Sequence, residues 1–417
     1  MCLFSMLNSK ETNEEISLAR ASQLKSYMAE YLKNKQNISH GMNAWNKSLI
    51  DKSRDSIMNH LGVQASDFGD WKWQFENRFS SIEDLSFYFN FDENDKASLL
   101  KASKQYRFST TPYYLSLINP NDPNDPVRKM TLVSTNELDG KGMIDPTQEG
   151  QTNPCGVITR RYPDRLIINV TNACAMYCRH CLRRRKIGDT DSNSSSKEID
   201  ASIDYISNNP EIRDVLITGG DPLTLSDEAI DDLLRRVRSI PHVQIIRIGT
   251  RTPVTMPQRI TPELVEILKK YHPLYLNTQF NHPIEITEES RQACLRLADG
   301  RVTLGNQMVL LRGVNDDKYI VRYLNEELLR IHVRPYYIYH PKKVIGTSHF
   351  YVSINTGLSI MDYLRGNTSG LAIPNYVLNA PGGLGKCPLP KSIVESNGIV
   401  YKIKNWEGID FDYSDEF

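Results

Sequence analysis

The fold of this chain is decided by one stretch, Thr171-Asn172-Ala173-Cys174-Ala175-Met176-Tyr177-Cys178-Arg179-His180-Cys181. It directly follows an apolar run, residues 165–170, that is typical of a buried strand. Three cysteines at C-x3-C-x2-C spacing on the loop that leaves a strand are poorly placed for a disulfide, but they can hold a metal cluster by three thiolates. A [4Fe–4S] cube normally takes four Cys ligands, so three would leave one iron open to bind something else.

This spacing resembles the cysteine motif of the radical S-adenosylmethionine (SAM) enzymes. The resemblance implies that Cys174, Cys178 and Cys181 ligate a [4Fe–4S] cluster, and that the open iron takes the amino and carboxylate groups of SAM. The alternative is a structural zinc site or scattered buried thiols. A zinc site would want a fourth Cys or His ligand and usually has paired C-x2-C arms.

After Gly156 the chain alternates between short β-branched runs and amphipathic helices. The runs lie at 165–170, 215–218, 244–249, 274–280, 302–311 and 333–340. This alternation predicts βαβ units and a parallel sheet. Six units are fewer than the eight of a closed TIM barrel, so we predict an α/β fold with an open (β/α)6 partial barrel. Reactive groups gather at the carboxyl ends of barrel strands, where the cysteine loop would lie.

We expect four segments along the chain. They are a helical extension over 1–65, an N-terminal helical region over 66–155, the partial barrel over 156–345 and a C-terminal segment over 346–417 that carries the lysine discussed below. The last segment should contain a hairpin, in which residues 393–395 pair with 399–401 around an Asn-Gly turn.

Composition limits the kind of partner and the compartment. Lys+Arg and Asp+Glu both total 50, so the net charge gives no indication of a nucleic-acid or acidic-membrane partner. No apolar run approaches the roughly 18 residues of a membrane-spanning helix. The first residues, Met1–Leu7, are too short for a signal-peptide core. Seven Cys, three of them clustered, fit a reducing compartment, so we expect a cytoplasmic protein.

The second strand ends in Thr218-Gly219-Gly220-Asp221-Pro222. Paired glycines at this place let the backbone approach a ligand closely. In the radical SAM enzymes a Gly-Gly-acidic segment contacts the SAM amino group. The resemblance therefore implies that Gly219, Gly220 and Asp221 bind SAM.

A second glycine-rich segment, residues 379–386, ends in Lys386. It fails the phosphate-binding Walker pattern, because Ala380 stands in place of Gly and Cys387 in place of Ser or Thr. A lysine on a flexible glycine loop could instead form a Schiff base with an aldehyde cofactor. The alternative is a plain surface loop.

From residue 71 to the C-terminus the chain resembles the lysine 2,3-aminomutase family, which uses SAM, a [4Fe–4S] cluster and pyridoxal 5′-phosphate (PLP). The matching segments are 111–117, 161–165, 171–181, 251–254, 305–307, 311–316 and 334–339.

The resemblance implies roles for five further residues. Lys386 falls at the lysine that binds PLP covalently. Arg161, Arg165 and Gln307 fall where the family binds the PLP phosphate, and the guanidinium fork suits phosphate oxygens. Arg183 falls where the family binds the substrate α-carboxylate. The alternative for Arg183 is an exposed basic run over residues 183–186.

The departures from the family indicate the substrate. Lysine aminomutases hold the substrate ε-ammonium with two Asp residues, whereas this chain has Lys342 and Asn379 at those places. A lysine substrate would face like-charge repulsion from Lys342, while a side-chain carboxylate would accept hydrogen bonds from both residues. This pattern resembles the glutamate 2,3-aminomutases, which interconvert L-glutamate and 3-aminoglutarate.

Three alternatives stay open at this point. Lys342 could point to solvent, with specificity set elsewhere. The substrate could then be lysine or another amino acid. In a different class, the chain could be an iron–sulfur and SAM protein that has lost PLP and acts in binding or electron transfer.

Other departures concern metals and SAM. Lysine aminomutases carry extra Cys residues, in the Val-Asn-Asp-Cys turn and near the C-terminus, that bind zinc. Here the turn continues with Asp317 and no Cys follows Cys387, so we expect no zinc. Gln279 replaces a family His, which leaves a SAM contact at this position open. The family further implies an external one-electron reductant and a homo-oligomer.

Overall fold

The computed structural model describes residues 12–389, 393–404 and 410–416. The stretch Met1–Leu7, on which the prediction about a signal peptide was based, lies outside these ranges. Contacts divide the chain into two units, residues 1–39 and 40–417. The first unit contains α1 (Asn13–Lys35), which begins with a capping box between Thr12 and Glu15. The boundaries expected near residues 65, 155 and 345 stay predictions.

The second unit contains the other helices and strands. Its α-helices are α2 (Ala44–Leu61), α3 (Ala65–Phe68), α4 (Trp71–Glu76), α5 (Glu93–Gln105), α6 (Pro112–Leu115), α7 (Pro126–Thr131), α8 (Ser196–Ser207), α9 (Asp227–Arg238), α10 (Thr252–Thr255), α11 (Pro262–Lys269), α12 (Glu288–Asp299), α13 (Lys318–Arg330) and α14 (Ile354–Leu364). Its strands are β1 (Ile158–Thr159), β2 (Arg165–Asn169), β3 (Asp214–Thr218), β4 (Ile245–Gly249), β5 (Leu274–Thr278), β6 (Thr303–Val309), β7 (Val333–Tyr339), β8 (Asn375–Asn379), β9 (Lys386–Pro388), β10 (Ile393–Ser396), β11 (Val400–Lys404) and β12 (Asp410–Ser414). Its short 3-10 helices are η2 (Glu83–Leu85), η3 (Thr135–Asp139), η4 (Glu149–Thr152), η5 (Arg184–Lys186), η6 (Pro222–Thr224), η7 (Pro257–Arg259), η8 (Pro283–Glu285), η9 (Ser348–Phe350), η10 (Gly370–Ala372) and η11 (Pro381–Gly383).

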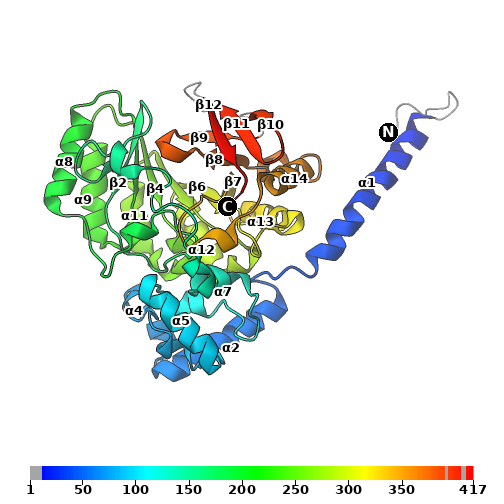
Figure 1. The fold of residues 1–417 in the computed structure, drawn as a ribbon, viewed down its shortest axis with the longest axis horizontal. Coiled ribbons are helices and arrows are strands. Elements are labelled where there is room, and N and C mark those ends of the chain that lie inside the picture. The colour runs from blue at the N-terminus through cyan, green and yellow to red at the C-terminus, as the bar shows by residue number, and fades with distance from the viewer. Residues whose placement is uncertain (1–11, 390–392, 405–409, 417) are drawn as a thin grey trace. The chain divides into compact units, whose positions relative to one another are not determined.

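Within the described residues, β1 to β9 form one open sheet in sequence order. Strands β2 to β8 pair in parallel, and β1 and β9 close the two edges in antiparallel fashion. Figure 1 shows α8, α9 and α11 along one side of this curled sheet. The six predicted runs correspond to β2–β7, so the open partial barrel is confirmed.

The segment around Lys386 differs from the expected flexible loop. Residues 375–379 form β8, and Lys386 begins β9, which pairs back onto β8. The apolar signal of β8 is only three residues long, Tyr376 to Leu378, and all three are buried. A run this short does not separate a strand from a loop by periodicity.

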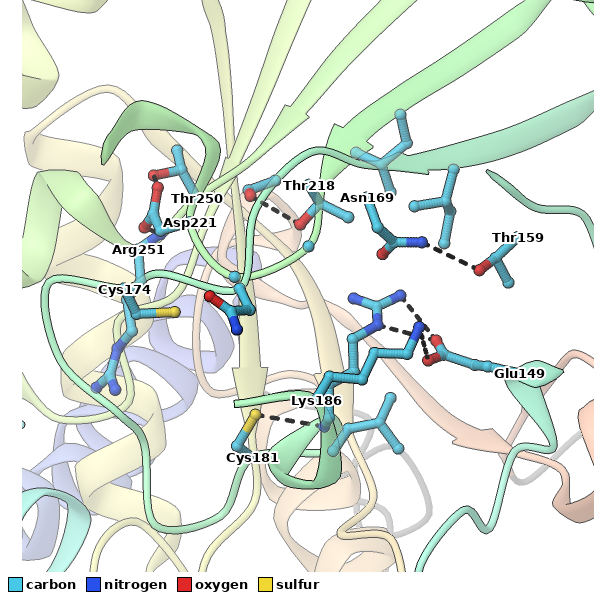
Figure 2. A pocket seen from close by; sticks show the side chains of 18 of the residues that line it. Glu149, Thr159, Asn169, Cys174, Cys181, Lys186, Thr218, Asp221, Thr250 and Arg251 are labelled. Carbon is cyan, nitrogen blue, oxygen red and sulfur yellow. Dashed lines mark hydrogen bonds and ion pairs between the residues drawn. The ribbon is translucent and has the colours of Figure 1, made fainter. Parts of the chain in front are cut away.

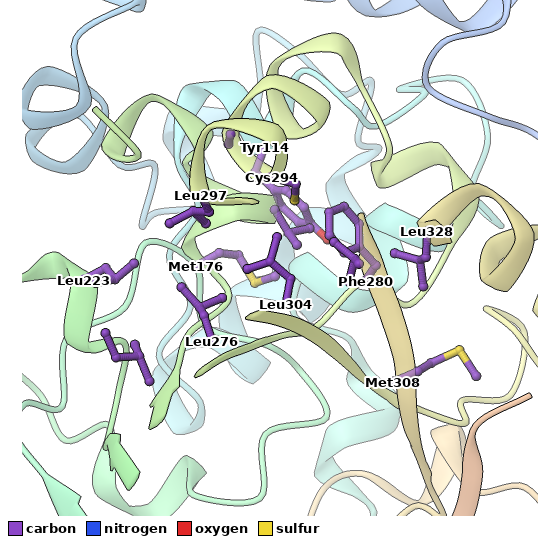
Figure 3. Close-up of a cluster of buried hydrophobic side chains, with 14 of the residues drawn as sticks. Tyr114, Met176, Leu223, Leu276, Phe280, Cys294, Leu297, Leu304, Met308 and Leu328 are labelled. Carbon is purple, nitrogen blue, oxygen red and sulfur yellow. The ribbon is translucent and has the colours of Figure 1, made fainter. Parts of the chain in front are cut away.

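The barrel strands alternate between two environments, as the period of two requires. Their buried positions pack into the hydrophobic core, while the intervening positions of the first three parallel strands line a cavity. The core positions of these strands are Leu166, Ile168, Val215, Ile217, Ile246 and Ile248. Figure 3 shows Leu276 and Leu304 of the sheet in the core cluster together with Cys294 and Leu297 of α12. Burying one such Leu side chain stabilises the fold by about 1.5–3 kcal/mol.

The helices around the sheet begin where their caps predict. Ser226 Oγ accepts the backbone N–H of Ala229 at the start of α9. Thr261 caps α11, with Pro262 in its first turn. Thr287 caps α12, which ends at Gly300. These side chains satisfy backbone donors that have no partner inside the helix.

The expected C-terminal hairpin is confirmed as β10 and β11, joined by a turn at Asn397-Gly398. Gly398 has φ +91°, a conformation that glycine adopts readily. A third strand, β12, adds to β11 and was not predicted.

Gly219 and Gly220 let the β3 loop lie directly against the cysteine loop. The Gly220 N–H donates to Thr171 O at 2.5 Å, and a Cβ at position 220 would lie 2.3 Å from Ala173 O. Gly219 has φ +132°. The paired glycines are therefore required by backbone packing, whatever ligand they also contact.

We expect Gly220→Ala to destabilise the ligand-free protein by about 1–3 kcal/mol, because the new methyl overlaps backbone atoms. Denaturant unfolding measures the change. The matched control is Gly370→Ala, since nothing lies within 4 Å of a Cβ there. Equal unfolding free energies for the two variants would contradict the close-approach argument.

Candidate active site

A cavity of about 770 Å³ opens at the carboxyl ends of the parallel strands. All the residues singled out from the sequence line it, although they come from positions 161 to 386. They are Arg161, Arg165, Cys174, Cys178, Cys181, Arg183, Gly219, Gly220, Asp221, Gln307, Lys342, Asn379 and Lys386. The fold thus brings these residues to one cavity, and the role of each stays a prediction.

The start of the cysteine loop is anchored by a charged cluster. Arg78 Nη1 donates to Cys174 O at 2.6 Å and its Nη2 contacts Asp191 Oδ2 at 2.7 Å. Tyr177 OH donates to the same carboxylate, and Arg107 contacts it at 2.9 Å. These bonds fix the backbone between the first two cysteines.

The end of the loop is anchored by Glu137 of η3. Its carboxylate accepts from Arg179 Nε at 3.0 Å and Nη2 at 2.7 Å, and also from Arg184. Burial opposes the ionisation of Glu137, but the two arginines hold its pKa below the ordinary value. Arg184 is therefore a buried ion-pair partner, which contradicts the exposed basic run at this position.

The cysteine thiols lie on the cavity wall, and Figure 2 shows the Cys174 and Cys181 side chains beside Asp221 and Lys186. Arg251 Nη1 lies 2.8 Å from Cys178 Sγ, and the backbone N–H of Arg183 donates to Cys181 Sγ at 3.3 Å. Burial raises the pKa of Cys174 and Cys181 above the ordinary thiol value. Ligation of a metal would displace these thiol protons.

Among the described residues, no group of three His, Cys, Asp or Glu side chains converges closely enough to hold a single metal ion. In a [4Fe–4S] cube each thiolate binds a different iron. The donor set of three thiols, with N–H donors directed at two of the sulfurs, fits such a cluster. The absence of zinc stays a prediction.

The Asp221 carboxylate already accepts hydrogen bonds from other residues of this chain. Its carboxylate accepts from Thr250 Oγ1 at 2.5 Å, from Arg251 N at 2.7 Å and from Leu223 N at 3.1 Å. Burial raises its pKa. Asp221 therefore ties together the loops after β3 and β4, and a direct SAM contact by its side chain stays a prediction.

Gln279 also lines the cavity, where its Nε2 lies 2.9 Å from His180 Nε2.

Glu149 is the central residue that sequence reasoning missed. Its side chain is 1% exposed, and it contacts Arg183 at 2.9 Å, Arg185 at 3.1 Å, Lys186 at 3.2 Å and Arg161 at 3.6 Å. Figure 2 shows Glu149 and Lys186 facing each other. Burial alone would raise its pKa, but Arg183, Lys186 and Arg161 lower it to about 2. Residues 146–152 carry no periodic pattern that would have revealed it.

Lys386 lies on the cavity wall without an anionic partner among the described side chains. Its Nζ lies over the rings of Tyr337 and Tyr339, at 5.2 and 5.8 Å from their centroids. Burial, with Arg247 and Arg165 nearby, lowers its pKa to about 7. Its cross-strand neighbour is Asn379. A neutral amine at physiological pH is the nucleophilic form that a Schiff base requires.

The neighbouring side chains fit a phosphate-bearing aldehyde cofactor. The Nε and Nη2 atoms of Arg161 are buried and have no hydrogen-bond partner in the described part of the chain, although Nη2 lies 3.6 Å from Glu149. Arg165 stacks over the Tyr162 ring at 4.0 Å, and Gln307 Oε1 accepts from Tyr339 OH at 3.2 Å. Unpartnered guanidinium N–H groups are the donors that a phosphate satisfies.

Lys342 follows β7 and, like Lys386, is a half-buried lysine on the cavity wall. Its Nζ lies 5.2 Å from the Tyr339 ring centroid, and no carboxylate among the described side chains pairs with it. Burial, with Arg161 and Arg183 nearby, lowers its pKa to about 8. It therefore lines the cavity and does not point to solvent.

Two further cations could have been found from the sequence. Arg247 interrupts the apolar run at 244–249, and it contacts Asp214 at 2.7 Å while lining the cavity. Arg251 directly follows that run, at a strand end where barrel enzymes place reactive groups. It binds Glu285 at 2.7 Å as well as Cys178.

The fold and the three-cysteine cavity define a radical SAM protein, and comparison with known proteins agrees. The radical SAM superfamily matches residues 168–323, and the C-terminal part of lysine-2,3-aminomutase matches 361–416. Glutamate 2,3-aminomutase of Clostridioides difficile strain 630 is 51% identical over 94% of this chain and 93% of its own. L-lysine 2,3-aminomutase of Clostridium subterminale is 48% identical over 85% and 86%.

This chain belongs to the 2,3-aminomutase family of radical SAM enzymes. It accordingly uses a [4Fe–4S] cluster, SAM and PLP, with a small amino acid as substrate and an external reductant. Among solved structures, Streptococcus suis SuiB bound to S-adenosylmethionine matches with a TM-score of 0.39 at 14% identity, over 52% of this chain and 48% of that one. No helix in the described part of the chain is long and apolar enough to span a membrane.

We expect the rate at which PLP attaches to the PLP-free protein to rise with pH through a midpoint near 7. The reason is that only the neutral Lys386 amine reacts, and its pKa is about 7 instead of 10.5. The visible absorbance band of the attached cofactor, followed by stopped flow, measures the rate. Between pH 7 and 10.5 Lys386 is protonated in the unfolded chain but neutral in the folded PLP-free protein. The free energy of unfolding should therefore increase as the pH rises through this range.

Lys386→Ala should abolish the band, whereas the exposed Lys101→Ala should retain it with the same midpoint. A midpoint above about pH 9 would contradict a depressed lysine pKa at the attachment site.

Proposed function

We propose that the enzyme interconverts L-glutamate and 3-aminoglutarate by moving the amino group between C2 and C3. The observation that carries this proposal is the half-buried Lys342 side chain, which lines the cavity and has no carboxylate partner among the described side chains. A glutamate side-chain carboxylate would supply that partner. Asn379, the cross-strand neighbour of Lys386, offers a second donor to the same group.

The charge of the cavity supports a dicarboxylate substrate. Lys and Arg outnumber Asp and Glu among the described residues that line it. The cations are Arg161, Arg165, Arg183, Lys186, Arg247, Arg251, Lys342 and Lys386, and the acids are Glu149, Glu198 and Asp221. A phosphate and two substrate carboxylates would offset this excess, whereas a lysine substrate would add another cation close to Lys342.

Overall identity does not choose between the substrates, because the glutamate and lysine relatives are 51% and 48% identical to this chain. The assignment of glutamate rather than lysine rests on Lys342 and Asn379, the two residues proposed to face the substrate side chain. A substrate ammonium beside Lys342 would be repelled by its like charge, which makes lysine a poor substrate.

In this proposal each side chain has one task. Arg161, Arg165 and Gln307 hold the cofactor phosphate, and Lys386 anchors the cofactor until substrate displaces it. Arg183 binds the α-carboxylate through Nη1, because its Nε and Nη2 are both bonded to Glu149. When bound, the cluster and SAM supply a hydrogen-abstracting radical, and PLP supplies the ring that stabilises the migrating amino group.

Product analysis tests the proposal directly. The reconstituted enzyme is incubated anaerobically with ¹³C-labelled glutamate or lysine, SAM, PLP and dithionite, and the product is identified by NMR. We expect 3-aminoglutarate from glutamate and negligible turnover of lysine. Conversion of lysine to 3,6-diaminohexanoate without glutamate turnover would overturn the substrate assignment.

The double variant Lys342→Asp, Asn379→Asp should lower kcat/KM for glutamate by at least about 100-fold, because two carboxylates would face the substrate carboxylate. The same NMR assay, run as a time course, measures the rate. Lys101→Asp is the control, since it reverses a lysine charge as Lys342→Asp does, but on an exposed part of α5. Retained glutamate turnover in the double variant would show that specificity lies elsewhere.

We further propose that the enzyme is a cytoplasmic homo-oligomer. The location is supported by the cysteine usage, which suits a reducing compartment, and the assembly by the family resemblance. Size-exclusion chromatography with light scattering tests the assembly, and a monomer at micromolar concentration would contradict it.

A further inference from the structure

The loop that carries Lys342 is bonded to the C-terminal end of the chain. His340, at the start of the loop, is completely buried. Its Nε2 lies 3.1 Å from Tyr413 OH and 3.3 Å from Tyr351 OH, and its Nδ1 lies 2.7 Å from Tyr376 OH. Three tyrosine hydroxyls, from β8, β12 and the segment before α14, therefore surround one imidazole.

The imidazole is held in its neutral form. Burial, with Lys343 and Lys342 nearby, lowers the pKa of His340 to about 3. A neutral imidazole offers one donor and one acceptor, and a tyrosine hydroxyl can serve as either. The cluster can therefore be fully satisfied without placing a charge in the core.

The cluster continues to the last described residues. Tyr351 OH donates to Asp415 Oδ1 at 2.9 Å, and the Ile354 N–H at the start of α14 donates to the same carboxylate at 3.0 Å. Tyr351 OH also lies 3.0 Å from Tyr413 OH. The carboxylate of Asp415 thus fixes residues 413–415 against the segment that precedes α14.

The other end of the loop is bonded to the same strand. Lys343 Nζ donates to Ser414 O at 2.6 Å and to Glu416 O. Lys342 lies between these two anchors, and its own ammonium lines the cavity. Residues on both sides of Lys342 are therefore bonded to residues 413–416, which are more than 70 positions away.

We propose that residues 413–416 act as a positioning element for Lys342, and that Tyr413, acting through His340, sets the affinity for the substrate side chain. This rests on the proposed function, because it deepens the role given there to Lys342. The described part of this element contacts the loop and the α14 segment and does not line the cavity. Tyr413 is thus a positioning residue.

The structure offers a closely matched pair of variants. Tyr413 and Tyr401 are buried tyrosines on adjacent strands of the same C-terminal sheet, at 6% and 2% exposure, and they pair across β11 and β12. Tyr401 OH donates to Asn355 Oδ1 at 2.8 Å, whereas Tyr413 OH contacts His340. Changing either to Phe removes one buried hydroxyl, but only Tyr413→Phe removes a contact to His340 at the start of the Lys342 loop.

The first measurement is the steady-state kinetics of the reconstituted enzyme with glutamate. We expect Tyr413→Phe to raise KM by roughly five- to tenfold with kcat within twofold of wild type, as the loss of one buried hydrogen bond predicts. Tyr401→Phe should leave both constants unchanged. Equal effects of the two variants, or a fall in kcat with constant KM, would overturn the proposal.

The second measurement does not depend on the substrate. The pH dependence of Lys342 labelling by an amine-reactive reagent, mapped by mass spectrometry, is recorded on the PLP-free protein. A loosened loop would expose Lys342, so Tyr413→Phe should raise the labelling midpoint above about 8 while Tyr401→Phe should not. The charged and titratable groups near Lys342 are the same residues in both variants. They are Arg161, Arg183, Glu149, Cys181, His180, His340 and Lys386.

These two measurements separate the possible failures. Absence of glutamate turnover by the wild-type enzyme would overturn the substrate assignment, and the labelling shift would still test the positioning role. Identical labelling of Lys342 in the two variants would overturn the positioning role even if glutamate is the substrate.

Discussion

The arrangement of cations on one wall of the cavity depends on a balance of charge around the buried Glu149 side chain. Arg161 and Arg183 both contact the Glu149 carboxylate. Two guanidinium groups this close together would repel each other without an anion between them. Glu149 supplies that anion from the cavity wall and contacts each guanidinium on one side only. The guanidinium groups are therefore held in place while keeping N–H groups available, which is the preorganised state that an anion-binding site needs. Lys342 and Lys386 have no such partner among the described side chains, so they provide the uncompensated positive charge.

The helical region that precedes the barrel contributes directly to the site. Glu137 and Arg78 both come from this region, and they anchor opposite ends of the cysteine loop. A loop fixed at both ends presents its three thiols in one arrangement, and such supporting contacts determine how well a site is formed. This explains why a partial barrel carries a large N-terminal addition: part of the support for its reactive loop lies outside the barrel.

Much of the architecture is readable from local patterns. The β-branched runs located β2–β7. The region around Lys386 was predicted less accurately, because a flexible loop was expected where the structure has β8 and β9. Its strand β8 has only three apolar residues, and its parallel pairing with β7 joins residues that are distant in sequence, such as Tyr337 and Asn375. A strand that is defined mainly by its partner cannot be recognised from its own sequence.

The sequence by itself determined the reaction class, through the spacing of its cysteines and its resemblance to the aminomutase family. The same resemblance predicted, without settling, the roles of Lys386, Lys342 and Asn379. Only the tertiary structure decided that Glu149 balances the cations, and that His340 and Tyr413 hold the Lys342 loop. The physical reason is distance along the chain. Glu149 and Arg183 are 34 positions apart, and His340 and Tyr413 are 73 apart, so neither pair leaves a local pattern. Their importance arises from burial, which exists only after the chain has folded.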